Sequence, residues 1–105
     1  MKNIGVKEMK KQIDSGKKFF ILDVREEEEL KYGTIKESNW IPIGEVESRI
    51  DEIPKDKDVV VYCRSGGRSG SVVSFLEEKG YKNATNLTGG ILDWGRFIDK
   101  SVQMY

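Results

Sequence analysis

Two short runs of the sequence are apolar on both faces and rich in β-forming residues. They span residues 19–24 (FFILDV) and 58–62 (DVVVY). Strands of this kind are typical of the centre of a parallel sheet, because helices cover both faces of such a sheet. Residues 39–42 and 84–87 form two weaker strand candidates. The pattern therefore predicts four strands, and we expect 59–62 to be the most deeply buried.

Helical segments are predicted between these strands. Apolar residues recur at helical spacing in four segments, which are 6–15, 45–53, 69–79 and 90–98. A fifth segment, 26–32, has the composition of a short acidic turn of helix. Alternating strands and helices are typical of α/β proteins, in which helices pack on both faces of a parallel sheet. The sequence thus predicts an α/β fold with three layers.

The length and charge of the chain limit its classes of partner. The sequence has 105 residues, which suits one domain over residues 1–105. Lys and Arg number 18, and Asp and Glu also number 18, so the formal net charge is zero. A balanced chain has no general attraction to nucleic acids or membrane surfaces, and we expect neither as a partner. The first residues contain no long apolar run, so we expect no signal peptide and a cytoplasmic protein.

The counts of histidine and cysteine exclude several kinds of chemistry. The sequence contains no histidine, which rules out Ser-His-Asp and Cys-His catalysis and zinc sites with histidine ligands. Cys63 is the only cysteine, so the chain has no internal disulfide, no Cys-x-x-Cys redox pair and no thiolate zinc cluster. We therefore expect a protein with a reduced thiol, without a metal and without a cofactor.

The candidate reactive group follows the most buried predicted strand. Cys63 begins the sequence CRSGGRSG, which leads into the predicted helix 69–79. Gly66 and Gly67 allow a tight backbone bowl whose N–H groups point inward and form an anion site. The N-terminus of the helix adds partial positive charge, and Ser69 is the expected N-cap. Ligands of open α/β sheets bind at this end of the strands.

Two arginines complete the pattern around the thiol. Arg64 and Arg68 bring two full positive charges to the loop. Nearby cations and a helix N-terminus lower the pKa of a cysteine, so we expect a thiolate at Cys63 that needs no histidine base. The alternative is that Cys63 is an inert core residue and the arginines are ordinary surface charges. The combination of all these features within eight residues favours a reactive thiolate that binds an anionic substrate.

Four motifs in order resemble the rhodanese family, specifically its small single-domain sulfurtransferases. The sequence CRSGGRS at 63–69 is similar to the active-site loop of that family. The other three motifs are LDVR at 22–25, the segment 33–42 from Gly-Thr-Ile to Ile-Pro, and the Leu-x-Gly-Gly-Ile element with its tryptophan at 87–94. The sequence departs from the family pattern at Thr34, at Glu37-Ser38, at Trp40 and in the ending 98–105. The first three departures lie in one segment, where they affect local packing and the choice of acceptor rather than the chemistry of Cys63.

The resemblance implies a five-stranded parallel sheet flanked by helices and a two-step reaction. The Cys63 thiolate would take a sulfane sulfur from a small anionic donor such as thiosulfate. The persulfide on Cys63 would then pass its outer sulfur to cyanide or a thiol, including a protein thiol. The loop N–H groups would hold the outer sulfur and Arg64 and Arg68 would steer the donor, so the expected substrate-binding residues are Arg64, Ser65, Gly66, Gly67, Arg68 and Ser69.

Residues outside the loop allow more than one interpretation. Asp23 and Arg25 lie at the carboxyl end of a predicted strand, where they form either a pair that braces the loop or an ordinary surface ion pair. The acidic run 26–29 is expected to be a solvated first turn of helix rather than a metal site. Trp94 and Phe97 are expected in the core, whereas Trp40 fits either the core or a contact with a partner.

Two other functions remain open from the sequence. Cysteine-dependent phosphatases and arsenate reductases on the same fold also use a loop with a cysteine and an arginine. The loop from Cys63 to Arg68 has six residues, one fewer than the loops of those phosphatases, which favours sulfur over phosphate. The second alternative is a non-enzymatic rhodanese-like binding module, although such modules usually lack the cysteine.

Overall fold

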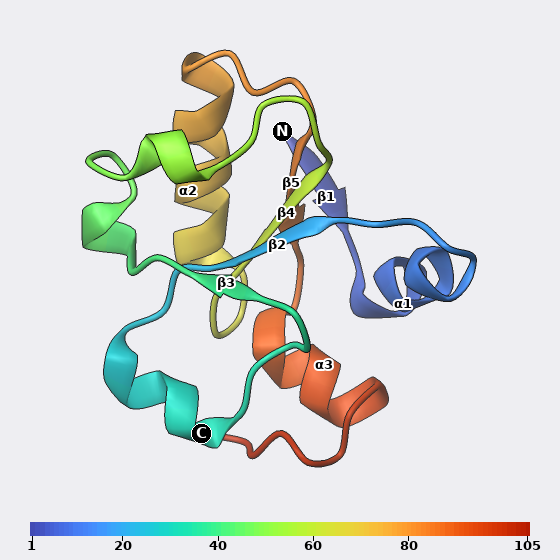
Figure 1. Cartoon of the computed structure of the whole chain (residues 1–105). Helices are drawn as coiled ribbons and strands as arrows, with labels where there is room; N and C mark the ends of the chain where they lie inside the picture. The colour runs from blue at the N-terminus through green and yellow to red at the C-terminus, as the bar shows by residue number, and fades with distance from the viewer.

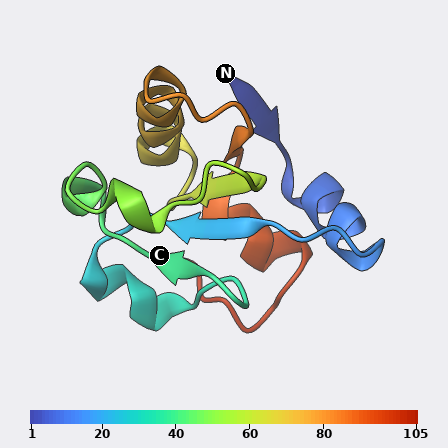
Figure 2. The same cartoon turned by 45° about the horizontal axis from the view of Figure 1, so that its top comes forward.

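Five parallel strands form the central sheet of the computed structural model, which describes residues 1–105. The order across the sheet is β1-β5-β4-β2-β3, and every neighbouring pair is parallel. The arrows of β2 and β3 point the same way in Figure 2. The strands are β1 (Lys2–Ile4), β2 (Phe20–Asp23), β3 (Asn39–Trp40), β4 (Val59–Tyr62) and β5 (Ala84–Leu87). The five-stranded parallel sheet that the resemblance to the rhodanese family implied is confirmed.

Helices cover both faces of the sheet (Figure 1). Helix α2 packs on one face, and α1 and α3 contact each other on the opposite face. Three short 3₁₀ helices lie in the connections. The helices are α1 (Val6–Asp14), η1 (Glu27–Tyr32), η2 (Ile43–Glu45), η3 (Ile50–Glu52), α2 (Gly67–Glu78) and α3 (Gly90–Phe97). No helix has the length and apolar character needed to cross a bilayer.

Strand β4 is buried along its whole length because its side chains alternate between two apolar clusters. Val59, Val61 and Cys63 face the cluster under α2. Val60 and Tyr62 face the cluster under α1 and α3. None of these five residues is more than 1% exposed. The prediction that 59–62 is the most buried strand is confirmed, and Cys63 is held in the core at its carboxyl end.

The first strand has no counterpart among the strands predicted from the pattern. Strand β1 lies at the edge of the sheet and pairs only with β5. Lys2 and Asn3 are exposed, and Ile4 is partly buried. An edge strand with one packed residue carries no apolar run, so its sequence lacks the periodic signal that identifies a buried strand.

The helix predicted over 45–53 is wrong. That region contains the 3₁₀ helices η2 and η3, separated by turns. Val46 and Ile53 are buried in the α2-side core, which explains their helical spacing in the sequence. The Tyr81 hydroxyl lies 3.1 Å from the carbonyl oxygen of Ile50 and 2.6 Å from that of Ile53. Short backbone hydrogen bonds, such as that from the N–H of Ile53 to the carbonyl oxygen of Ile50, together with contact with Tyr81 take the place of a continuous helix.

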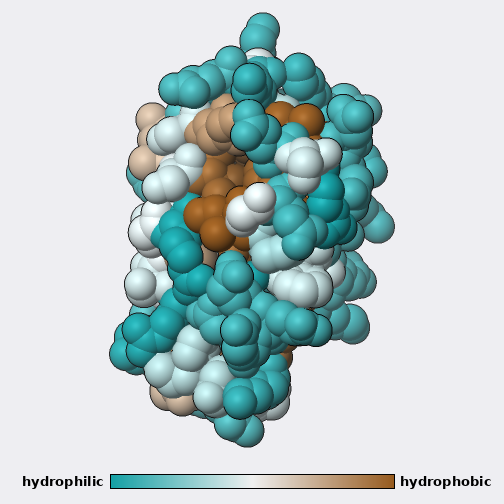
Figure 3. Space-filling view, turned by 90° about the vertical axis from the view of Figure 1, so that its left-hand side faces the viewer, coloured by the Kyte–Doolittle hydropathy of each residue, from teal (hydrophilic) through white to brown (hydrophobic).

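A small apolar hollow lies between this irregular segment and α2. Figure 3 shows hydrophobic atoms gathered among hydrophilic ones on that side of the molecule. The hollow has a volume of about 190 Å³. Its lining residues are Ile43, Val46, Glu47, Ser71, Val72 and Phe75.

The aromatic residues singled out in the sequence have different positions. Trp94 is buried against α1 and the sheet, as predicted. Phe97 is 53% exposed, so its predicted core position is wrong; its ring lies 4.6 Å from the Lys7 ammonium at the surface. Trp40 is 37% exposed, and its indole N–H donates to the carbonyl oxygen of Arg25 at 2.8 Å. Trp40 is therefore a surface residue with an anchored ring.

Candidate active site

The loop between β4 and α2 brings Cys63 to the N-terminus of α2. Gly66 is the N-cap of α2 and has a φ of 117°, a conformation that favours glycine. Gly67 is the first residue of the helix and has no positive φ. The predicted N-cap at Ser69 is wrong, because the helix begins at Gly67 and Ser69 lies in its first turn. This earlier start turns the N–H of Ser69 toward the thiol.

Main-chain N–H groups and one hydroxyl surround the sulfur of Cys63. The N–H groups of Gly66 and Ser69 donate to Sγ at 3.2 and 3.4 Å, and Ser69 Oγ lies 3.4 Å away. Burial by itself raises the pKa of the Cys63 thiol. Hydrogen bonds from the Ser69 hydroxyl and from the N–H groups of Ser69, Gly66 and Ser65 outweigh burial and hold this pKa below its ordinary value.

Asn86 supports this arrangement from the next strand. Its Oδ1 accepts a hydrogen bond of 2.6 Å from the Ser69 hydroxyl, and its Nδ2 donates to the carbonyl oxygen of Gly66 at 3.2 Å. The Asn86 side chain is buried within β5. It therefore fixes two residues that contact Sγ. Sequence reasoning missed Asn86, although a polar residue in a strand beside the buried β4 is a signal that could have pointed to it.

The N-terminus of α3 holds the start of the same loop. The N–H groups of Ile91 and Leu92 donate to the carbonyl oxygens of Cys63 and Arg64 at 3.0 and 3.2 Å. Gly90 has a φ of 56° and lies directly against those two carbonyl groups. The Gly-Gly element near residue 90 thus positions the backbone of Cys63, although it is far from Cys63 in the sequence.

Arg68 forms an ion pair with Glu29. Its two terminal nitrogens donate to the Glu29 carboxylate at 2.7 and 2.9 Å. Hydrogen bonds from Arg68 lower the pKa of Glu29 to about 2, and Glu29 in turn raises the pKa of Arg68 above its ordinary value. Glu29 belongs to the acidic run that the sequence assigned to solvent, so that expectation is wrong for this member. Four adjacent glutamates gave no signal as to which one faces the loop.

Arg64 has a different partner. Its guanidinium donates to the main-chain oxygen of Tyr105 and lies 5.2 Å from the centre of the Tyr105 ring. Both arginines of the loop are therefore engaged by other groups. The largest influences on the Cys63 thiol are burial and hydrogen bonds from the loop and from Ser69, rather than the two arginine charges that the sequence suggested.

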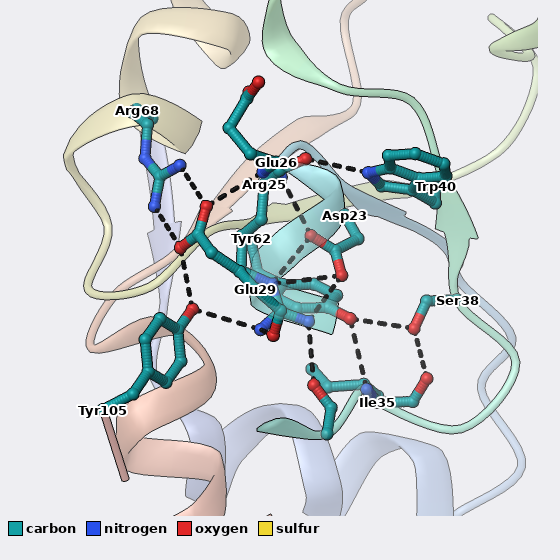
Figure 4. A network of polar contacts seen from close by, with 11 residues as sticks. Asp23, Arg25, Glu26, Glu29, Ile35, Ser38, Trp40, Tyr62, Arg68 and Tyr105 are labelled. Carbon is teal, nitrogen blue, oxygen red and sulfur yellow. Dashed lines mark hydrogen bonds and ion pairs between the residues drawn. The ribbon is translucent and has the colours of Figure 1, made fainter. Parts of the chain in front are cut away.

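Asp23 and Arg25 form a buried ion pair (Figure 4). Arg25 is fully buried and donates to both carboxylate oxygens of Asp23 at 2.8 to 3.2 Å. It also donates to the carbonyl oxygen of Gly33 at 2.8 Å and to the Tyr105 hydroxyl at 3.1 Å. The interpretation of Asp23 and Arg25 as an ordinary surface ion pair is therefore wrong. Arg25 braces η1 and the segment after it, and reaches the loop only through Glu29 and Tyr105.

Tyr62 lies beneath this pair and links it to the segment that departs from the family pattern. The Arg25 guanidinium is 5.5 Å from the Tyr62 ring centre. The Tyr62 hydroxyl accepts a hydrogen bond from the N–H of Ile35 at 3.2 Å and lies 3.0 Å from Ser38 Oγ. Burial raises the pKa of Tyr62 above its ordinary value. Ser38, one of the departures, therefore packs as a partner of a buried hydroxyl (Figure 4).

Comparison with known proteins identifies the family of this chain. A family model described as the rhodanese-like domain matches residues 5–96. A sulfurtransferase of Allochromatium vinosum is 42% identical over 76 residues, which cover 72% of this chain and 71% of that protein.

Solved structures of the same family have the same fold. A rhodanese-like domain protein from Staphylococcus aureus is 34% identical, with a TM-score of 0.85 over 90% of this chain and 92% of that one. The human single-domain sulfurtransferase TSTD1 is 25% identical, with a TM-score of 0.77 over 92% of this chain and 97% of that one. The matched sequence includes the whole β4–α2 loop with Cys63. The chain therefore belongs to the rhodanese-like domain family.

Proposed function

We propose that this protein is a sulfurtransferase that carries a sulfane sulfur as a persulfide on Cys63. The observation that carries this proposal is the environment of Sγ. The only thiol of the chain lies at a helix N-terminus and accepts hydrogen bonds from the N–H groups of Gly66 and Ser69. Its pKa is lowered. Such an environment favours the thiolate, which is the nucleophilic form of cysteine. Relatives named sulfurtransferases support the same reaction class.

In the first step the Cys63 thiolate attacks the outer sulfur of the donor. With thiosulfate, the new bond joins Sγ to the outer sulfur, and the sulfur–sulfur bond of the donor breaks. Its electron pair leaves with sulfite, and the negative charge of the thiolate passes to the outer sulfur of the persulfide. The total charge is the same before and after, so no proton has to move and no histidine is needed.

In the second step a thiophilic acceptor removes the outer sulfur. A cyanide ion or a thiolate attacks that atom, and the bond between it and Sγ breaks. The electron pair returns to Sγ, which regenerates the Cys63 thiolate and gives thiocyanate or a new persulfide. The hydrogen bonds that stabilise the Cys63 thiolate in the free protein also stabilise it as the leaving group here, because a low thiol pKa favours departure.

The remaining loop residues have proposed roles in binding the donor. The N–H groups of Ser65, Gly66 and Gly67 lie at the start of α2, where partial positive charge suits an anion. Arg64 and Arg68 would guide the donor at the mouth of the loop, with their charges moderated by Tyr105 and Glu29, and Ser69 would orient Sγ. Cys63 is only 1% exposed, so a single terminal sulfur atom reaches it more readily than a bulky electrophile.

An assay of thiocyanate formation from thiosulfate and cyanide tests this function. We expect turnover by the protein and none by Cys63→Ser, with Ser74→Ala on the exposed side of α2 as a control of full activity. Turnover by Cys63→Ser would overturn the proposal. A parallel assay with p-nitrophenyl phosphate covers the phosphatase alternative, for which we expect no turnover. A folded protein inactive in both assays would favour a binding module.

A further inference from the structure

We propose that Glu29 and Tyr105 are specificity-determining residues that make the site discriminate against doubly charged sulfur donors. They do so by binding the guanidinium groups of Arg68 and Arg64. This inference rests on the sulfur transfer proposed above. It concerns which donor the site accepts, not whether Cys63 carries sulfur. Tyr105 lies beyond residues 5–96, the part that matches the family model.

The first observation is the bidentate ion pair between Glu29 and Arg68. Two hydrogen bonds of 2.7 and 2.9 Å align the two planar groups. The Glu29 side chain is 17% exposed and that of Arg68 is 35% exposed, so water screens the pair only in part. A pair of this geometry is stronger than an ordinary surface pair. A donor that binds Arg68 must therefore compete with a fixed carboxylate.

The second observation is that Tyr105 fixes Glu29 and also engages Arg64. The Tyr105 hydroxyl donates to Glu29 at 2.9 Å and accepts from the buried Arg25 at 3.1 Å (Figure 4). The Tyr105 ring stacks on Tyr32, with 4.5 Å between ring centres and 9° between planes. Its main-chain oxygen accepts from Arg64. One residue thus holds the carboxylate against Arg68 and keeps Arg64 beside its own ring.

These contacts change the charge that an incoming donor meets. Without them the loop would offer two free guanidinium groups to an anion. With them, the Arg68 charge is balanced by Glu29, and Arg64 already has an oxygen as partner. Attraction to a donor scales with the charge of that donor, so this balance penalises a dianion more than a monoanion. The geometry points to monoanionic sulfane donors, such as thiosulfonates and persulfides, as the favoured class.

The experiment compares two donors that differ in charge. Thiosulfate is a dianion and benzenethiosulfonate is a monoanion, and both transfer an outer sulfur to a thiolate. KM and kcat are measured for both donors with the wild-type protein, Glu29→Gln and Glu28→Gln. Glu28 is an exposed neighbour with the same charge, so Glu28→Gln is the matched control. We expect Glu29→Gln to lower KM for thiosulfate by about threefold or more, to lower KM for benzenethiosulfonate less, and to change kcat little.

A second set of variants separates specificity from folding. Tyr105→Phe keeps the ring stack and the main-chain oxygen but removes the hydroxyl that fixes Glu29, so we expect a smaller fall in KM for thiosulfate in the same direction. In an Arg68→Gln background, Glu29→Gln should lower KM less than it does in the wild-type protein, because no guanidinium is released and only direct repulsion by the carboxylate is removed. Circular dichroism and urea unfolding of each variant establish that it is folded.

The outcomes distinguish this inference from the proposed function. Absence of sulfur transfer by the wild-type protein with both donors would contradict the proposed function itself. Transfer by the wild type with equal KM changes in Glu29→Gln and Glu28→Gln would overturn the specificity inference alone. Equal KM changes for the two donors in Glu29→Gln would do the same, because they would show that donor charge is not what Glu29 discriminates.

Discussion

Gly90 lies so close to Arg64 that a Cβ atom at residue 90 would be 2.5 Å from the Arg64 carbonyl oxygen. The same atom would be 2.6 Å from the carbonyl oxygen of Cys63. No side chain fits there, and the positive φ of Gly90 adds strain for any other residue. The close approach lets the N–H groups at the start of α3 bind the two carbonyl oxygens. These hydrogen bonds fix the backbone at the start of the loop that surrounds Sγ.

Replacement of Gly90 is therefore expected to disturb the loop. We expect Gly90→Ala to lower the free energy of unfolding by about 1–3 kcal/mol and to reduce sulfur transfer, because the Cys63 and Arg64 carbonyls must move. Gly44→Ala is the matched control, since Gly44 has no positive φ and no atom near the position of a Cβ. Urea unfolding and the thiosulfate–cyanide assay check both variants; equal effects would show that the close approach is not important.

The pH dependence of thiol alkylation reports the state of Cys63. The rate with iodoacetamide rises with pH as the thiolate forms, and we expect its midpoint below the ordinary thiol pKa of 9.0. Ser69→Ala should move the midpoint upward, because the Ser69 hydroxyl, which lies 3.4 Å from Sγ and also donates to Asn86, is one of the groups that lower the pKa of the Cys63 thiol. Ser74→Ala should leave it unchanged. A wild-type midpoint at or above 9.0 would contradict the role assigned to these hydrogen bonds.

The buried pair of Asp23 and Arg25 is expected to matter for stability. Arg25→Met leaves the Asp23 carboxylate buried without its cation, which costs about 3–5 kcal/mol in comparable buried pairs. Arg49→Met removes an exposed arginine with two acidic partners, and we expect a much smaller loss. Urea unfolding of the two variants measures the difference, and similar losses would show that burial of the pair has no special effect.

Glu29 is expected to make stability depend on pH in acid. Its pKa falls from an ordinary value of 4.5 to about 2 in the folded protein. Its ion pair therefore stabilises the fold above pH 4.5, and this contribution is lost as the pH falls toward 2. Between these pH values the wild-type protein should lose more unfolding free energy than Glu29→Gln. Glu28→Gln should lose as much unfolding free energy over this pH range as the wild-type protein. If Glu29→Gln loses the same amount too, the ion pair between Glu29 and Arg68 does not stabilise the fold.

The central part of the fold could be predicted from the sequence because burial leaves a clear pattern there. Strands β2, β4 and β5 lie inside the sheet, and their segments were identified to within a residue or two. The edge strand β1 was missed because only Ile4 packs. The segment 45–53 was misassigned because Val46 and Ile53 reach the core from 3₁₀ turns with the spacing of a helix.

The candidate site was predictable only where the chemistry lies in one continuous segment. Residues 63–69 contain the thiol, the glycines and the helix start together. Asn86, Glu29 and Tyr105 come from other elements, and their positions follow from how β5, η1 and the end of the chain pack around the loop. The arginine partners were unpredictable for the same reason, since nothing local marks Glu29 among four glutamates or Tyr105 as a neighbour of Arg64.

The intact mass of the protein after incubation with thiosulfate tests the central claim most directly. A persulfide on Cys63 adds one sulfur atom, or ~32 Da, and cyanide should remove it and restore the original mass. We expect this gain in the wild-type protein and none in Cys63→Ser, which has no thiol. An unchanged wild-type mass, or the same gain in Cys63→Ser, would contradict the assignment of Cys63 as the sulfur carrier.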